Sequence, residues 1–189
     1  CKTAILINGI PASGKSTITR LLAETFSLPV LTIDGIKEPF MARLAPVDRP
    51  MNRQLGCAAY EVIWSIVAAS PARMVWLIDA WFGFQPRETL QKLLRQAGVE
   101  QVIEIWNHIS PELAVARYAS RLATRPPGHP GEEYLPELAQ LAGRAQPMSL
   151  GPLLTIDQQR PLEIPAVIPG LEGTISGQRP GLANYASPS

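Results

Sequence analysis

The chain has 189 residues, of which 46% are hydrophobic, and its formal net charge is +1; this length allows one substantial core and is short for two domains. Basic residues do not cluster with interleaved aromatic side chains, so we expect no long nucleic acid as a partner. No apolar run approaches the length of a membrane span and no signal-peptide pattern opens the sequence, so we expect a cytoplasmic protein with no membrane contact.

The most informative segment lies near the start of the sequence. Residues 4–7 form an apolar run that is expected to be a buried strand, and residues 9–16, directly after it, read Gly-Ile-Pro-Ala-Ser-Gly-Lys-Ser. A strand, a glycine-rich loop and a helix in this order are the context in which a P-loop pattern is informative. The segment therefore predicts a phosphate-binding loop.

In such a loop, successive backbone N–H groups face the β-phosphate of a nucleotide, and Gly9 and Gly14 are expected to supply the positive φ angles that this needs. Lys15 adds a point charge, and Ser16 offers a hydroxyl ligand to Mg²⁺. The dipole of the following helix favours an anion at its N-terminus. The predicted nucleotide-binding residues of the loop are Gly9, Ala12, Ser13, Gly14, Lys15, Ser16 and Thr17.

Apolar periodicity predicts alternating strands and helices along the rest of the chain. Beyond the first strand, strands are expected at 28–33, 74–78, 102–106 and 153–156, and helices at 15–26, 35–44, 52–69, 86–96, from 110 onward, and 134–145. This order predicts an α/β fold with a five-stranded parallel sheet and right-handed crossovers. We expect one domain over residues 1–175 and a disordered tail over 176–189.

Three aspartates, Asp34, Asp79 and Asp157, each follow an expected strand. Because the carboxyl ends of parallel strands meet at one edge of a sheet, all three could approach the phosphate-binding loop. We assign Asp34 as the general base, since phosphoryl transfer to an alcohol needs an acceptor for the hydroxyl proton. The alternative is an aspartate that only caps a turn or helix. Asp157 is interpreted as structural or as lying near the adenine.

Asp79 closes the apolar run 74–78 in the manner of a Walker B strand, where the aspartate holds Mg²⁺ directly or through water. The same carboxylate could instead orient a substrate hydroxyl, so both roles stay open. The rings that follow, Trp81, Phe82 and Phe84, could line an acceptor pocket, although each ring taken singly is more simply a core residue.

Arginine recurs every fourth residue at Arg117, Arg121 and Arg125, a spacing that places the three side chains on one helix face. Because a Pro- and Gly-rich loop with His129 follows, we predict a lid over about 117–134 that closes on phosphates and excludes water. Arg121 and Arg125 are assigned to the migrating charge, and Arg117 and Arg121 to nucleotide binding. A solvated helix face is the alternative.

With these pieces assembled, the sequence resembles the P-loop small-molecule kinases with an adenylate-kinase-like core, in the branch labelled AAA-like ATPase domain. The resemblance spans most of residues 3–170 and extends more loosely to chloramphenicol phosphotransferase and zeta-toxin kinases. The segments that carry it are 9–17, 34–38, 55–62, 79–82 and 117–121.

The resemblance implies a three-layer P-loop fold with strand order 2-3-1-4-5, ATP and Mg²⁺ as donor and cofactor, and Asp34 at the position of the relatives' catalytic base. We therefore expect an ATP-dependent phosphotransferase that moves the γ-phosphate to a hydroxyl of a small organic molecule, acting as a monomer or homodimer. The acceptor is expected between the helix after Asp34, the helix with Tyr60 and Trp64, and the segment 81–84. A nucleotide-dependent regulatory ATPase without an acceptor and a 5′-polynucleotide kinase are the alternatives.

Overall fold

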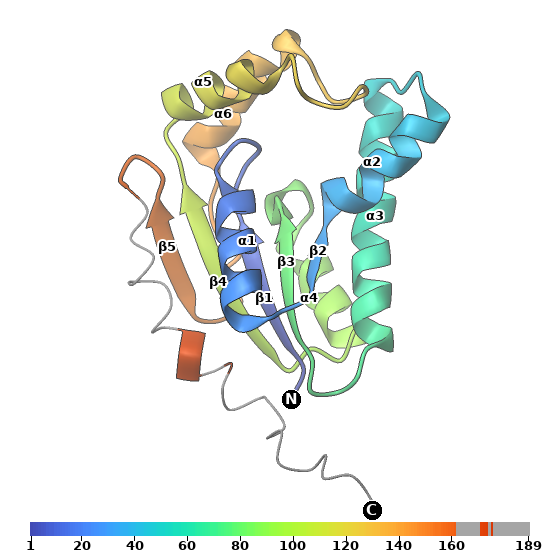
Figure 1. Ribbon diagram of the computed structural model, residues 1–189, viewed down its shortest axis with the longest axis vertical. Helices are drawn as coiled ribbons and strands as arrows, with labels where there is room; N and C mark the ends of the chain where they lie inside the picture. The colour runs from blue at the N-terminus through green and yellow to red at the C-terminus, as the bar shows by residue number, and fades with distance from the viewer. Residues whose placement is uncertain (162–170, 174, 176–189) are drawn as a thin grey trace, which may run out of the picture.

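The computed structural model describes residues 1–161, 171–173 and 175. Five parallel strands form its central sheet: β1 (Thr3–Asn8), β2 (Val30–Thr32), β3 (Val75–Ala80), β4 (Gln101–His108) and β5 (Leu153–Asp157). Their order is β2-β3-β1-β4-β5, which confirms the predicted fold class and topology (Figure 1). The expected tail, 176–189, lies outside the described residues.

Helices cover both faces of the sheet and the carboxyl ends of its strands (Figure 1). They are α1 (Lys15–Phe26), α2 (Ile33–Leu44), α3 (Arg49–Ala69), α4 (Arg87–Gln96), α5 (Pro111–Arg121) and α6 (Leu135–Arg144), with short 3₁₀ turns η1 (Phe82–Phe84) and η2 (Glu132–Tyr134). In the described part of the chain, no helix is both long and apolar enough to span a membrane.

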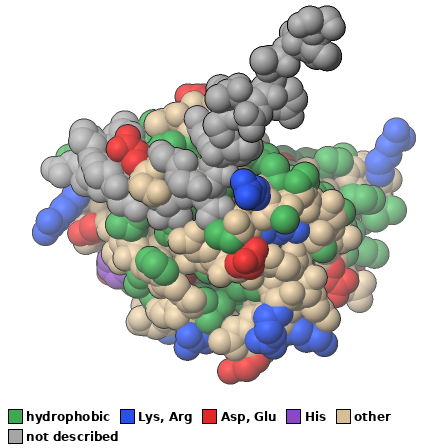
Figure 2. Space-filling view, turned by 90° about the horizontal axis from the view of Figure 1, so that it is seen from below, with side chains coloured by type: hydrophobic (Ala, Val, Ile, Leu, Met, Phe, Trp, Pro, Cys, Tyr) green, Lys and Arg blue, Asp and Glu red, His purple; other side chains and the backbone are tan. Residues whose placement is uncertain are grey.

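Strand β1 is buried along its whole length because helices pack on both of its faces. Ile5 and Ile7 belong to one core cluster with Ile18 of α1, whereas Ala4 and Leu6 belong to another with residues of α3 and α4. This alternation explains why the sequence shows a continuous apolar run here. At the opposite end of the sheet, seen in Figure 2, acidic and basic side chains are interspersed.

Among the element boundaries that differ from the sequence prediction, three helix ends are informative for the site. Helix α2 begins at Ile33, because the Thr32 side chain caps it by accepting a hydrogen bond from the Gly35 N–H. Helix α3 begins at Arg49 instead of residue 52, since Asp48 caps it and a proline is tolerated in a first turn. Helix α5 ends at Arg121, before the predicted arginine row is complete.

One carboxylate is completely buried in the sheet. Glu104 of β4 accepts hydrogen bonds from Asn8 Nδ2 at 2.8 Å, from Met148 N at 2.9 Å and from Ser149 N at 2.8 Å. Asn8 Oδ1 in turn accepts from Phe82 N, so this network fixes the turn after β3 that contributes to the cavity described below. Sequence analysis did not single out Glu104, although it is a charge inside an apolar run.

Removing this carboxylate should destabilise the fold strongly. Glu104→Ala leaves two buried donors and one part-buried donor without their partner, and we expect the free energy of unfolding to fall by about 3 kcal/mol or more. Denaturant unfolding measures this change, with Glu61→Ala on the exposed surface of α3 as the control. A loss no larger than that of the control would contradict the proposed importance of the network.

Candidate active site

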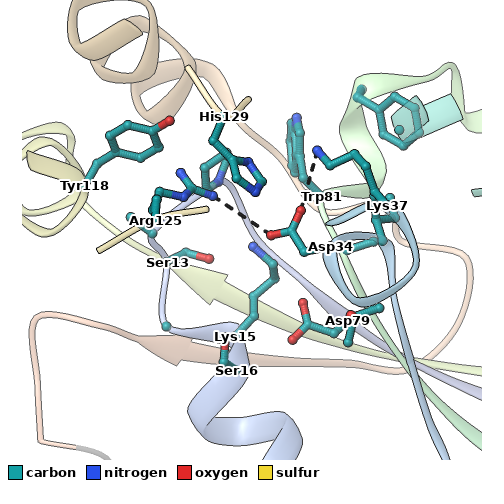
Figure 3. Close-up of a pocket in the computed structure, with 18 of the residues that line it drawn as sticks. Ser13, Lys15, Ser16, Asp34, Lys37, Asp79, Trp81, Tyr118, Arg125 and His129 are labelled. Carbon is teal, nitrogen blue, oxygen red and sulfur yellow. Dashed lines mark ion pairs between the residues drawn. The ribbon is translucent and has the colours of Figure 1, made fainter. Parts of the chain in front are cut away.

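A cavity of about 990 Å³ opens at the carboxyl ends of the central strands. Its walls come from the loop after β1, the first turns of α1 and α2, the N-terminal half of α3, the turn after β3, the lid segment (residues 117–134) and α6. Figure 3 shows side chains from these elements converging on one space. The position is the one in which open parallel sheets bind ligands.

The loop after β1 has the shape that a phosphate-binding turn needs, but its positive φ angles are not all where we predicted them. Gly14 has φ +85° and caps α1, as expected, whereas the second positive φ, 65°, belongs to Ala12. Gly9 does not have a positive φ. It is required for another reason, because a Cβ at this position would collide with Ser13 Oγ.

Two loop residues differ in how much they contribute to the cavity wall. Ser13 lines the cavity and is fully buried, and its Oγ has no hydrogen-bond partner among the described residues. Thr17 is exposed and lies outside the lining, so only its position in the first turn of α1 connects it with the site. A buried hydroxyl without a partner is costly unless a ligand or water completes it.

The Lys15 ammonium lies at the centre of the site. Its Nζ donates hydrogen bonds to the carbonyl oxygens of Gly9 at 2.8 Å and Ile10 at 2.9 Å. Burial lowers the pKa of Lys15, while the nearby carboxylates of Asp79 and Asp34 act in the opposite direction. In Figure 3 the side chain extends from the loop toward Asp34. The ammonium is thus poised between two carboxylates in a place where anion binding would satisfy it.

Asp79 lies within β3, one residue before its end, and it lines the cavity together with Ser16. One of its oxygens accepts a hydrogen bond from Thr19 Oγ1 at 3.0 Å. Burial raises the pKa of Asp79, and Lys15 and the Thr19 hydrogen bond partly offset this effect. A carboxylate and a hydroxyl beside a phosphate-binding loop are oxygen donors of the kind that Mg²⁺ takes.

Asp34 is in the first turn of α2, and its side chain is 52% exposed. It forms ion pairs with Lys37 at 3.5 Å and with Arg125 at 3.9 Å (Figure 3). The capping alternative for Asp34 is wrong, because Thr32 caps this helix. Asp157 lies apart from the cavity on the edge strand β5, where it accepts a hydrogen bond from Gln159 N and pairs with an arginine.

The three arginines of the predicted row do not share one face. Arg121 and Arg125 line the cavity, and the Arg125 guanidinium lies over the Tyr118 ring, 4.7 Å from its centroid. Arg125 follows the end of α5 and therefore leaves the helical spacing. Arg117 is outside the cavity lining and donates a hydrogen bond to Gln158 Oε1 at 3.0 Å, beside Gly14.

The segment that was predicted as a lid contacts α2, and sequence analysis did not predict this contact. His129 Nε2 lies 2.9 Å from Glu38 Oε1, and the His129 side chain is only 4% exposed. Gly128, with φ +98°, approaches the Met41 side chain so closely that a Cβ would be 2.6 Å from its Cε. Burial lowers the pKa of His129, and the hydrogen bond to Glu38 raises it. His129 therefore joins the lid segment to α2.

Helix α3, which was predicted to border the acceptor, lines the cavity, but it does so closer to its start than Tyr60 and Trp64. Tyr60 and Trp64 of α3 are buried in the core and do not line the cavity. The α3 residues that line it are Arg49, Asn52, Arg53 and Gly56, closer to the start of the helix.

Helix α6 supplies a wall that the sequence pattern did not indicate. Three positions of α6 and one position in the turn before it line the cavity and are spaced on one helix face: Tyr134, Glu137, Leu141 and Arg144. Of the three rings after Asp79, Trp81 and Phe84 line the cavity, whereas Phe82 is fully buried in the core.

Comparison with solved structures finds the same fold in proteins described as kinases. A crystal structure of a candidate kinase from Chloroflexus aurantiacus has a TM-score of 0.75 and 26% identity, with 95% of this chain and 99% of that chain covered. A sugar kinase from Janibacter sp. has a TM-score of 0.59 and 18% identity, with 95% of this chain and 98% of that chain covered. A gluconokinase from Sinorhizobium meliloti has a TM-score of 0.58 and 17% identity, with 93% of this chain and 92% of that chain covered. The chain has the fold of these kinases. No protein-family model matches the sequence, and no curated protein matches it.

The ionised Asp79 carboxylate suits the chemistry of the site, but its burial is expected to lower the stability of the fold. The pKa of Asp79 is higher in the folded protein than in the unfolded chain, where it is near 3.8. Ionisation of Asp79 at pH 7 therefore lowers the free energy of unfolding. Without nucleotide or metal, Asp79→Asn should therefore unfold at a slightly higher temperature than wild type at pH 7. The difference should shrink toward pH 4.

Calorimetric unfolding at several pH values measures this difference. Asp157→Asn, which changes a carboxylate outside the cavity, is the control and should show no such gain. A lower unfolding temperature for Asp79→Asn at pH 7 would mean that the ionised carboxylate stabilises the fold through Lys15.

Proposed function

We propose that this chain is an ATP-dependent kinase that transfers the γ-phosphate to a hydroxyl group of a small organic molecule. The observation that carries the proposal is the meeting of two charged groups from separate elements in one cavity. Lys15 comes from the loop after β1 and Asp34 from the first turn of α2, and each side chain is near enough to influence the other electrostatically. Phosphoryl transfer to an alcohol needs a site that binds the phosphates and, next to it, a carboxylate that can accept the hydroxyl proton.

The loop residues fit a nucleotide's phosphates. Ser13 Oγ, buried without a partner, and the first N–H groups of α1 are unsatisfied donors, and Lys15 adds a positive charge that now contacts only carbonyl oxygens and lies near carboxylates. A triphosphate would provide acceptors for all of them at once. Arg117 and Gln158, hydrogen-bonded beside Gly14, are placed to border the nucleoside part.

Mg²⁺ also fits the residues present. Ser16 and Asp79 line the same cavity and offer a hydroxyl and a carboxylate oxygen, both hard ligands. When bound, the ion would neutralise charge on the phosphates. Asp79 itself is kept in place by the Thr19 hydroxyl, so one of its oxygens is committed to the protein and the other is available.

The transfer step can be written for the residues that line the cavity. The acceptor oxygen attacks the γ-phosphorus, the bond from this phosphorus to the β–γ bridging oxygen breaks, and ADP leaves. Asp34 accepts the hydroxyl proton. Its ion pairs with Lys37 and Arg125 orient the carboxylate toward the space in which the acceptor would lie.

The lid segment supplies positive charge and excludes water. Arg121 and Arg125 line the same cavity as Lys15, where they would stabilise charge on the transferred phosphoryl group. His129 lines the cavity, and its contact with Glu38 joins the lid segment to α2. A cavity of about 990 Å³ supports a small acceptor.

Asp34→Asn separates this proposal from a regulatory ATPase without an acceptor. Because the amide cannot accept the hydroxyl proton, we expect acceptor phosphorylation to fall by about 10²- to 10⁴-fold. The Kd for ATP in the presence of Mg²⁺ should change little, since Asp34 lies outside the phosphate-binding loop. Coupled assay of acceptor-dependent ADP release and titration calorimetry measure the two quantities.

The matched control is Asp157→Asn, which should retain full transfer activity. Slow ATP hydrolysis that no acceptor stimulates, and that Asp34→Asn leaves intact, is the behaviour of a regulatory ATPase and would refute the kinase proposal.

A further inference from the structure

We infer that the acceptor carries a negative charge in addition to the hydroxyl that is phosphorylated, and that this charge is held between α3 and α6 by Arg53 and Arg144. The inference rests on the proposed kinase function and concerns the half of the cavity that the nucleotide does not need. It assigns the acceptor to one chemical class, hydroxylated anions.

Positive charge is concentrated in the cavity. Eight of the 17 Lys and Arg residues of the chain line it, against four of the 16 Asp and Glu residues. The chain as a whole has a net charge of only +1, so this excess belongs to the cavity. ATP with bound Mg²⁺ carries about two net negative charges, which leaves positive charge without a counterpart. A cavity with such a surplus attracts an anionic second ligand.

The surplus of positive charge in the cavity can be assigned to particular residues. On the acceptor side, Lys37 pairs with Asp34, and Arg49 of α3 pairs with Glu137 of α6 at 2.9 Å. The second pair ties the two helices together across the cavity. These four charges therefore cancel and do not call for a charged ligand.

The charges of Arg53 and Arg144 are not cancelled in this way. Arg53 is one turn beyond Arg49 on the same face of α3, and Arg144 is two turns beyond Glu137 on the same face of α6. Within the described residues neither guanidinium has a carboxylate partner. Guanidinium groups suit carboxylate and phosphate because their N–H groups match a pair of oxygens.

The surroundings indicate that the anion also carries hydroxyl groups. Asn52 is placed between Arg49 and Arg53 in the sequence of α3, and its Oδ1 is buried without a hydrogen-bond partner among the described residues. A buried carbonyl oxygen of this kind can accept a hydrogen bond from a hydroxyl group of the ligand. Trp81 and Phe84 form an uncharged wall, so the carbon skeleton of the acceptor has a surface to pack on.

The charge of the acceptor can be tested before its identity is known. An ultrafiltered extract of cell metabolites is separated at neutral pH on an anion-exchange column, and the retained and flow-through fractions are each incubated with the protein, Mg²⁺ and γ-labelled ATP. We expect transfer of label to a small molecule of the retained fraction. Pretreating that fraction with phosphatase, later removed, distinguishes the two sources of charge, because a carboxylate acceptor survives and a phosphate-bearing one does not.

Variants then test the two arginines. Arg53→Gln and Arg144→Gln should each raise the KM for the retained acceptor roughly tenfold, while kcat and the Kd for ATP stay within about twofold. Arg95→Gln is the matched control, because Arg95 is exposed in the last turn of α4 and does not line the cavity.

The outcomes separate this inference from the function on which it rests. Transfer only to a flow-through molecule, or arginine variants with unchanged KM, overturns the inference and leaves the kinase proposal standing. No transfer to either fraction, by protein that binds ATP, contradicts the kinase proposal and the inference with it.

Discussion

A buried ammonium group organises this site. Lys15 is held by two carbonyl oxygens of its own loop, and the attraction of Asp79 and Asp34 offsets part of the burial that lowers its pKa. Carbonyl oxygens satisfy the hydrogen bonds of a cation but not its charge, so an anion bound beside the loop would be stabilised by the ammonium. The left-handed turn at Gly14 fixes this arrangement, because it starts α1 directly behind the ammonium.

The donor and acceptor halves of the cavity share their charged groups. Asp34, the proposed base, pairs with Lys37 of its own helix and with Arg125 of the lid segment. The lid segment also contacts α2 through His129 and Glu38. In the proposed kinase, movement of the lid segment would therefore change the surroundings of the base as well as those of the phosphates, and closure of the cavity would be linked to activation of the acceptor.

Local signals in the sequence predicted much of the architecture. Apolar runs predicted all five strands, and the glycine loop predicted a phosphate-binding site that lies at the cavity, but the resemblance was needed for the strand order. The features that could not be predicted from the sequence depend on three-dimensional packing. The ring of Tyr60 is in the core rather than in the pocket, and the wall formed by α6 depends on how two distant helices pack. The charge of Glu104 within an apolar run was a signal that we did not use.

Titration calorimetry of the folded protein with ATP and Mg²⁺ tests the central claim most directly. The account predicts one binding site and a Kd that Lys15→Ala weakens by about tenfold or more, whereas Lys92→Ala, on the exposed surface of α4, leaves it unchanged. Circular dichroism verifies that each variant is folded. Absence of nucleotide binding by folded wild-type protein, or equal affinity in Lys15→Ala, would contradict the account.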